Sequence, residues 1–340
     1  MPTTDPNERA HRPRLRERRN FWPVVALLVI LGLNLAVFPQ KFLVVREGRL
    51  FGTLSEVLQQ GSTVMILAVG MTLVIATAGI DLSVGSVMAI CGAVAALLLT
   101  RTWLPLAGVL AVALVVGGCA GLWNGLLVAF LGLQPIVATL ILLVAGRGVA
   151  QLLTSGQIIT FKHPAFKFIG TGHLLGLPFP VYLVVIVAGA TILATRLTVA
   201  GLYVEAVGNN ERASRLAGLR PGLVKSLVYG FSGLCAAVSG LIETSYISAA
   251  DINKCGEYIE LDAILAVVIG GTPFTGGRAN IVGSVIGAAI MQALSTTIQM
   301  LDVPAAYTLV VKALAVVAVC SLGSEKFRRA MRRLVPAGAS

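Results

Sequence analysis

The residues that could do chemistry in this chain are polar side chains set singly within long apolar runs. A polar or ionisable side chain inside a membrane is costly, so by default it is a candidate for a substrate or ion path. On this ground we take eight residues as candidates for a translocation path: Asp81, Ser83, Asn124, Gln134, Thr139, Arg147, Glu243 and Asp262. Gln292 and Lys312 are two further polar residues in apolar runs. For each residue, a helix cap or a hydrogen bond between helices is an equally good interpretation.

Asp81 and Arg147 have the most informative neighbours. Asp81 stands in the sequence Gly-Ile-Asp-Leu-Ser-Val-Gly-Ser. Either Asp81 or Ser83 can cap the helix that follows, while an unwound turn lines a cavity. Arg147 lies between Gly146 and Gly148, so its side chain can lie against a neighbouring backbone or pair with an acid.

Residues for covalent or metal chemistry are scarce. The three histidines, His11, His163 and His173, fall in a tail and in an outer loop. The stretch 270–278 is rich in glycine, but it lacks the Lys-Ser/Thr pair with which a phosphate loop holds phosphate and magnesium. We therefore predict no catalytic residues, no metal site and no cofactor in this chain. If ATP drives its function, a separate ATPase subunit must bind the ATP and the magnesium.

The composition indicates that membrane helices position these residues. Of the 340 residues, 56% are hydrophobic and only 12% are charged, which excludes a water-soluble fold. A helix of about 20 apolar residues crosses a bilayer. Gly117, Gly121 and Gly125 recur at every fourth position, which predicts close packing of their helix against another. We predict an all-α protein with ten spans, near 21–38, 57–77, 82–100, 104–130, 136–153, 178–195, 226–245, 261–277, 280–300 and 304–322.

The basic residues predict how the spans are oriented, because lysine and arginine collect in cytoplasmic segments. Residues 1–20 carry six arginines, and residues 323–340 carry five basic residues. We therefore expect both termini in the cytoplasm, as basic tails on either side of one transmembrane domain over residues 21–322. The net charge of +11 is then a topology signal and not a sign of nucleic-acid binding.

Two parts of the chain share a short pattern. At an offset of 198 positions, residues 66–69 match 264–267, and residues 84–87 match 282–285. Internal repeats are common in transporters, where they surround the central pathway. Chance matching between apolar helices is an equally good explanation.

The longest predicted cytoplasmic segment between spans is 196–225. Its pattern predicts a helix, a turn at 208–210 and a second short helix over 211–217, with Asn210 as the N-cap and Gly218 at the end. The apolar side of the short helix consists of Ala213, Leu216 and Ala217. Such a surface suits insertion into a cleft of a partner protein, and a solvated connecting loop is the alternative.

Four segments carry a resemblance to a known family: residues 70–90, 132–157, 205–219 and 260–278. From about residue 50 to 320 the chain resembles the ribose-type permeases of ATP-binding-cassette (ABC) sugar importers, and within them the galactofuranose permeases. The combination of Gly-Ile-Asp-Leu-Ser-Val-Gly-Ser with a later Ala-Val-Gly-Asn-Asn loop is specific. Two features depart from the family pattern, namely Thr-Pro-Phe-Thr at 272–275 and the arginine-rich residues 1–20.

The resemblance implies a transport function and a set of partners. The chain would lie in a bacterial inner membrane and pair with an identical or homologous permease, a cytoplasmic ABC ATPase and a periplasmic sugar-binding protein. It would import a sugar, galactofuranose by similarity, through alternating access. The loop at 205–218 would couple it to the ATPase through the following residues: Glu205, Val207, Gly208, Asn209, Glu211, Ala213, Leu216 and Gly218. A bulky charged residue at Gly208 or Ala213 is expected to uncouple transport without unfolding the protein.

A secondary sugar transporter or facilitator that works alone is the alternative function. In it Asp81, Arg147, Glu243 and Asp262 would carry a proton or ion relay. The loop at 205–218 separates the two hypotheses, because it has no purpose without an ATPase. An intramembrane enzyme is a third class, and the chain lacks the catalytic residues it would need.

Overall fold

The computed structural model describes residues 20–46, 48–301, 307, 310–314 and 317. Its helices are α1 (Phe21–Val37), α2 (Pro39–Phe42), α3 (Thr53–Ala76), α4 (Val84–Arg101), α5 (Leu106–Ala129), α6 (Pro135–Thr154), α7 (Pro164–Thr171), α8 (Phe179–Leu197), α9 (Val199–Asn209), α10 (Glu211–Leu216), α11 (Pro221–Ile247), α12 (Ile259–Ile269) and α13 (Ile281–Met300). Short antiparallel strand pairs join β1 (Val44–Arg46) to β2 (Arg49–Phe51), β3 (Ile159–Thr160) to β6 (Ala249–Ala250), and β4 (His173–Leu174) to β5 (Leu177–Pro178).

The helices are those of a multi-pass membrane protein, as the composition predicts. Within the described residues, seven helices are long and apolar enough to cross a membrane: α3, α4, α5, α6, α8, α11 and α13. Helix α1 is also apolar, but it has only 17 residues. The predicted count of ten spans is therefore not confirmed.

Besides α1, two of the ten predicted spans are missing from the seven candidate spans. The prediction of a span over 261–277 is wrong, because α12 has 11 residues and ends at Ile269. Gly270 follows as the C-cap, and Gly271 has a φ of +85°, a backbone conformation that a continuing helix does not allow. Of the predicted span 304–322, only residues 307, 310–314 and 317 are among the described residues.

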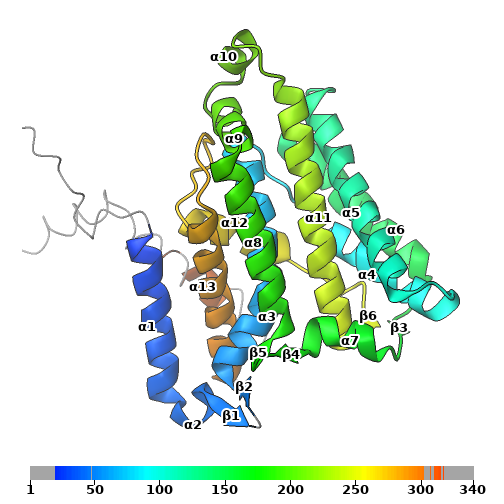
Figure 1. Cartoon of the computed structure of the whole chain (residues 1–340), viewed down its shortest axis with the longest axis vertical. Coiled ribbons are helices and arrows are strands. Elements are labelled where there is room, and N and C mark those ends of the chain that lie inside the picture. The colour runs from blue at the N-terminus through cyan, green and yellow to red at the C-terminus, as the bar shows by residue number, and fades with distance from the viewer. Residues whose placement is uncertain (1–19, 47, 302–306, 308–309, 315–316, 318–340) are drawn as a thin grey trace, which may run out of the picture.

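The long helices run between two ends of the molecule (Figure 1). Helix α10 stands at one end, which we call the α10 end. Helix α7 and the short strands lie at the opposite end, which we call the α7 end (Figure 1). Helices α3 and α11 form the centre, since 83% and 72% of their apolar windows are buried, against 22% for each of α5, α6 and α8. The outer helices can remain apolar all round because lipid surrounds them.

Helix α5 packs along α11 through small residues, as the glycine spacing predicts. A Cβ atom on Gly117 would lie 2.6 Å from the Cβ of Ala237. One on Gly125 would lie 2.6 Å from the Cα of Ser226. Real Cβ atoms do not approach so closely, so any larger residue at these positions would force the two helices apart.

Two segments inside the bundle are not helical. Residues 77–83 join α3 to α4, and residues 251–258 lead from β6 into α12. The short sequence repeat falls on corresponding places, because its first part lies within α3 and α12 and its second part begins α4 and α13. The N–H of Gly277 donates to the carbonyl of Ala76 at 2.8 Å, so the connection between α12 and α13 touches the end of α3. A common origin of the two helix pairs remains a prediction.

Candidate translocation site and coupling element

Asp81 lies at the centre of a closed polar cluster. It is 1% exposed and stands in the non-helical segment between α3 and α4. Its Oδ1 accepts hydrogen bonds from the N–H and the hydroxyl of Ser83, at 3.0 and 2.7 Å, and its Oδ2 accepts one from Ser232 on α11 at 2.8 Å. Asn124 on α5 donates to the Oγ of Ser83 at 2.8 Å. These bonds tie the segment to two neighbouring helices.

Two more residues hold the same segment. Tyr229 on α11 donates to the carbonyl of Ile80 at 3.2 Å. The buried hydroxyl of Thr139 donates within α6 at 2.9 Å and makes a longer contact of 3.4 Å with that same carbonyl. Ser83 precedes α4, but no side chain caps this helix, and its hydroxyl faces Asp81 instead. The sequence expectation of a side-chain cap at this position is therefore wrong.

The hydrogen bonds of the Asp81 cluster favour a structural role. A break in a helix inside a membrane leaves polar backbone groups that would each cost several kcal/mol if they stayed unpaired. The carboxylate of Asp81 accepts three hydrogen bonds and is closed off from solvent. Of the two interpretations given for this residue, the geometry favours hydrogen bonding between helices over contact with a transported molecule.

Arg147 on α6 holds the second non-helical segment. Its Nη1 donates to the carbonyl oxygens of Ile252 and Cys255 at 2.9 and 2.6 Å, and its Nη2 donates to that of Gly256 at 2.6 Å. A Cβ on Gly256 would lie 2.7 Å from the carbonyl oxygen of Gly85 in the first turn of α4. Residues 251–258 are thus fixed between α4 and α6, and Arg147 lies against a backbone, which is one of its two predicted environments.

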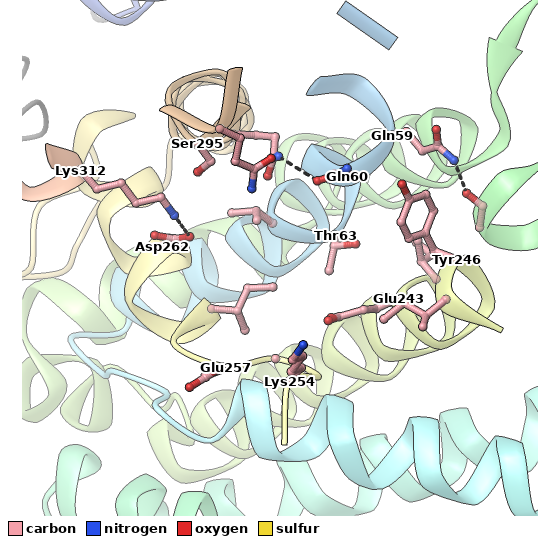
Figure 2. A pocket seen from close by; sticks show the side chains of 18 residues that line it. Gln59, Gln60, Thr63, Glu243, Tyr246, Lys254, Glu257, Asp262, Ser295 and Lys312 are labelled. Atoms are coloured by element: carbon pink, nitrogen blue, oxygen red, sulfur yellow. Dashed lines mark hydrogen bonds and ion pairs between the residues drawn. The ribbon is translucent and has the colours of Figure 1, made fainter. Parts of the chain in front are cut away.

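A polar cavity of about 420 Å³ lies between α3, α11, α12 and α13 (Figure 2). Its polar and charged lining consists of Gln59, Gln60, Thr63, Glu243, Tyr246, Lys254, Glu257, Asp262, Gln292, Ser295, Gln299 and Lys312. In Figure 2 the side chains of Thr63, Glu243 and Lys254 surround its open centre. Lys254 belongs to the segment that Arg147 holds, so that segment forms one wall of the cavity.

Of the eight path candidates taken from the sequence, only two line this cavity, namely Glu243 and Asp262. Two stripes of polar residues also line the cavity and are not among these candidates. Gln59, Gln60 and Thr63 share a face of α3, and Gln292, Ser295 and Gln299 share a face of α13. Gln59 and Gln60 lie four and three residues before Thr63, and the members of the second stripe follow one another at three and four residues. Residues at these spacings are neighbours on the surface of a helix. Polar residues at this spacing in an otherwise apolar helix were the signal that could have identified the cavity.

The groups that line the cavity are mostly uncharged or paired. Asp262 forms an ion pair with Lys312, whose Nζ lies 2.8 Å from its Oδ2. Gln292 donates from Nε2 to the Oε1 of Gln60 at 3.4 Å, and Gln59 donates to a backbone carbonyl at 2.7 Å. Within the part of the chain that the structure describes, no three His, Cys, Asp or Glu residues gather as metal ligands would. The arrangement can therefore bind a small polar molecule through hydrogen bonds.

Gln134 lies elsewhere than the other path candidates. It is exposed at the N-terminus of α6, and its side chain does not cap that helix. It lines neither the cavity nor the Asp81 cluster. A path role for this residue remains a prediction.

The coupling residues from the sequence divide into an inner and an outer set. On the inner side, Glu205 accepts a hydrogen bond from the N–H of Ala279 at 3.2 Å. Asn209 donates to the carbonyl of Gly277 at 3.4 Å. Val207 is 3% exposed. Helix α9 is thus attached to the connection between α12 and α13.

Gly208 belongs to the same inner set. A Cβ at this position would collide with the carbonyl oxygen of Ala76 at the end of α3, and would lie 2.6 Å from the backbone nitrogen of Gly277. A bulky side chain cannot enter without separating α9 from α3. This geometry contradicts the expectation that a large charged residue at Gly208 would leave the protein folded.

The outer set lies on α10, at the tip of the molecule (Figure 1). The side chain of Asn210 accepts from the N–H of Ala213 at 3.0 Å, and Gly218 has a φ of +87°, so the predicted cap and the predicted end of this helix are confirmed. Glu211 pairs with Lys225 at 2.7 Å, which fastens α10 to α11. Leu216 is 91% exposed.

The comparisons with known proteins agree with one another. The family described as "Branched-chain amino acid transport system / permease component" matches residues 53–320. The galactofuranose transporter permease of Escherichia coli (strain K12) is 48% identical over 329 residues, which cover 96% of each chain. The fructose import permease of Bifidobacterium longum (strain NCC 2705) is 40% identical over 90% of this chain and 87% of its own. The ribose import permease of E. coli (strain K12) is 38% identical over 89% and 93%.

Proposed function

The chain belongs to the permease family of the branched-chain amino acid transport systems, and from this premise we propose that it is the permease subunit of an ABC importer for a sugar. The observation that carries the proposal is the similarity over nearly the whole chain to permeases named for galactofuranose, fructose and ribose. Galactofuranose is the first candidate substrate, since the relative named for it is 48% identical over 96% of both chains.

The proposed mechanism is alternating access in the inner membrane of a bacterium. The α10 end faces the cytoplasm and the α7 end faces the periplasm, in keeping with the basic residues at both termini. A sugar-loaded periplasmic binding protein docks at the α7 end. A separate ABC ATPase binds ATP and magnesium at the α10 end, and its closure moves the helices so that the path opens inward. No covalent step takes place in this chain.

We assign the two sets of coupling residues different parts in that mechanism. Glu211, Ala213 and Leu216 on α10 contact the ATPase. Glu205 and Asn209 on α9 pass the motion on, because their hydrogen bonds reach the connection between α12 and α13. A second permease, identical or homologous, completes the assembly, and residues 1–20 and 323–340 form basic tails on the cytoplasmic side.

The importer proposal is tested first by what the chain assembles with. The tagged chain would be purified from its native membrane in mild detergent, and the proteins that come with it would be identified by mass spectrometry. An ATP-binding subunit, together with ATP-dependent uptake of labelled galactofuranose in proteoliposomes, is the expected result. A chain that stays alone after crosslinking and moves sugar down its gradient without ATP would instead be a secondary transporter.

Competition identifies the sugar. Unlabelled galactofuranose is expected to suppress uptake of the labelled sugar at lower concentrations than unlabelled ribose does. If ribose competes better, the importer assignment stands and the galactofuranose assignment is wrong.

A further inference from the structure

We propose that the polar cavity between α3, α11, α12 and α13 is the sugar-binding site of this chain, and that Gln60 and Gln292 recognise two neighbouring hydroxyl groups of a neutral sugar there. This inference rests on the proposed function and adds the place and the chemistry of binding. The volume of the cavity, about 420 Å³, lies within the usual range of small-molecule sites.

The first step of the argument concerns two amides that meet across the cavity. Gln292 on α13 donates from Nε2 to the Oε1 of Gln60 on α3, at 3.4 Å. That bond leaves the Nε2 of Gln60 as a donor and the Oε1 of Gln292 as an acceptor, both without a hydrogen-bond partner among the described residues. Each hydroxyl of a sugar can donate and accept. A neighbouring donor and acceptor therefore match two adjacent hydroxyls.

The weakness of the existing contact supports the same conclusion. Hydrogen bonds between N–H and O groups in proteins are usually 2.7 to 3.2 Å long. The amide contact at 3.4 Å is longer than that range, whereas the bonds to the carboxylate of Asp81 are 2.7 to 3.0 Å. A ligand can replace a long amide contact at little cost in free energy.

The second step concerns the charge of the ligand. Thr63 and Glu243 face the centre of the cavity from α3 and α11 (Figure 2). A hydroxyl and a carboxyl group can both bind sugar hydroxyls. The charged groups of the lining are Glu243, Glu257, Asp262, Lys254 and Lys312. Three carboxyl groups and two ammonium groups nearly balance one another, so the cavity suits a neutral sugar.

The place of binding is tested by protection of an introduced cysteine. The exposed Cys119 is first changed to serine. Ser295→Cys then puts a thiol in the cavity and changes only one heavy atom, the hydroxyl oxygen, to sulfur. Asn253→Cys is the control, because Asn253 is exposed beside Lys254 but does not line the cavity. Both variants would be assembled with their partner subunits in proteoliposomes and labelled with a hydrophilic maleimide.

Saturating galactofuranose is expected to slow the labelling of Ser295→Cys at least fivefold and to leave Asn253→Cys unchanged. Stimulation of ATP hydrolysis by the loaded binding protein is measured in the same vesicles. Stimulation without protection would overturn the site and leave the importer assignment standing. If no sugar produces either effect, both the site and the proposed function fail.

The chemistry of recognition is tested with a sugar analogue that lacks one of two adjacent hydroxyls. The unaltered chain is expected to carry this deoxy analogue at least tenfold less well than the parent sugar. Gln292→Leu and Gln60→Leu should each remove most of that preference, because the paired donor and acceptor are gone. If both variants keep the full preference for the parent sugar, the assignment of these two glutamines is wrong.

Discussion

Two groups of polar residues lie among the helices of this permease, and they differ in how fully their hydrogen bonds are used. Around Asp81 the bonds are 2.7 to 3.0 Å long, the carboxylate accepts three of them, and the residue is 1% exposed. In the cavity, Gln60 and Gln292 meet at 3.4 Å and keep a donor and an acceptor unused. Both groups consist of polar residues within or beside apolar helices, and the sequence alone does not separate them.

The difference indicates which role the polar side chains have in the Asp81 cluster and which they have in the cavity. A closed cluster stabilises the fold, because every bond it contains would be lost on opening. An open cavity contributes little to the fold, and its free donors and acceptors remain available to a ligand. The comparison therefore predicts that substitutions around Asp81 lower stability, while substitutions in the cavity lower transport.

The largest loss of folding free energy is expected for Asp81→Ala. Removal of the carboxylate leaves the hydroxyls of Ser83 and Ser232 without their acceptor in a buried site, and each such group costs about 1 to 3 kcal/mol. The free energy of unfolding should fall by about 3 kcal/mol or more. The midpoint of thermal unfolding in detergent and the amount of protein in the membrane measure it.

Asp81→Asn is the matched control for that variant. It keeps the volume of the side chain and one acceptor oxygen for Ser83, but it loses the acceptor for Ser232. A loss clearly smaller than that of Asp81→Ala is expected. If Asp81→Ala unfolds at the same temperature as the unaltered chain while sugar uptake falls, Asp81 would belong to the translocation path and would not stabilise the fold.

An intermediate loss of folding free energy is expected for Arg147→Lys. The guanidinium reaches three carbonyl oxygens of residues 252–256 at 2.6 to 2.9 Å, and the single ammonium of lysine cannot reproduce this fork. Hydrogen bonds to charged groups contribute about 1.5 to 3 kcal/mol each, so a loss of about 2 kcal/mol is expected. Hydrogen exchange of the amides in 251–258 should become faster. Unchanged exchange there would mean that other contacts hold this wall of the cavity.

A small loss of folding free energy is expected for Gln60→Leu. Its amide makes one long hydrogen bond, and leucine is of similar size and suits an apolar helix. The free energy of unfolding should change by no more than about 0.5 kcal/mol, as for substitutions away from packed features. ATP-driven uptake should nevertheless fall at least tenfold. A loss of stability as large as that of Asp81→Ala would erase the distinction between the cavity and the cluster.

How far the sequence predicts these regions depends on how local their causes are. The cap of α10 by Asn210 and the close approach at Gly117 follow from neighbours in the sequence or along one helix, and both were predicted correctly. The sequence identifies Asp81 as a candidate because a lone acid in an apolar run is rare. Its partners Ser232 and Asn124 were not predicted as partners, since Ser232 lies 151 residues from Asp81 and Asn124 lies 41 from Ser83.

The cavity was harder to predict for the same reason. Gln60 and Gln292 are 232 residues apart, and neither is unusual by itself. The partners of Arg147 are backbone carbonyls, which every residue carries, so no pattern of side chains indicates them. Hydropathy predicts a span over the apolar run at 261–277 because it does not register the turn at Gly271, where α12 has already ended.

The smallest loss of stability, close to zero, is expected for Leu216→Glu, and it extends the comparison to the α9–α10 element. Leu216 is 91% exposed on α10, so its replacement removes almost no contact within this chain. If α10 docks in an apolar cleft of the ATPase, a buried charge there should weaken the complex by about 2 kcal/mol or more, as at interface hot spots. ATP-driven uptake would then be lost while thermal unfolding stays unchanged. Gly208→Leu is the contrasting variant, because its side chain would collide with the end of α3 and should lower the unfolding temperature. If Leu216→Glu transports normally, α10 is a solvated loop, and the coupling role passes to the inner residues of α9.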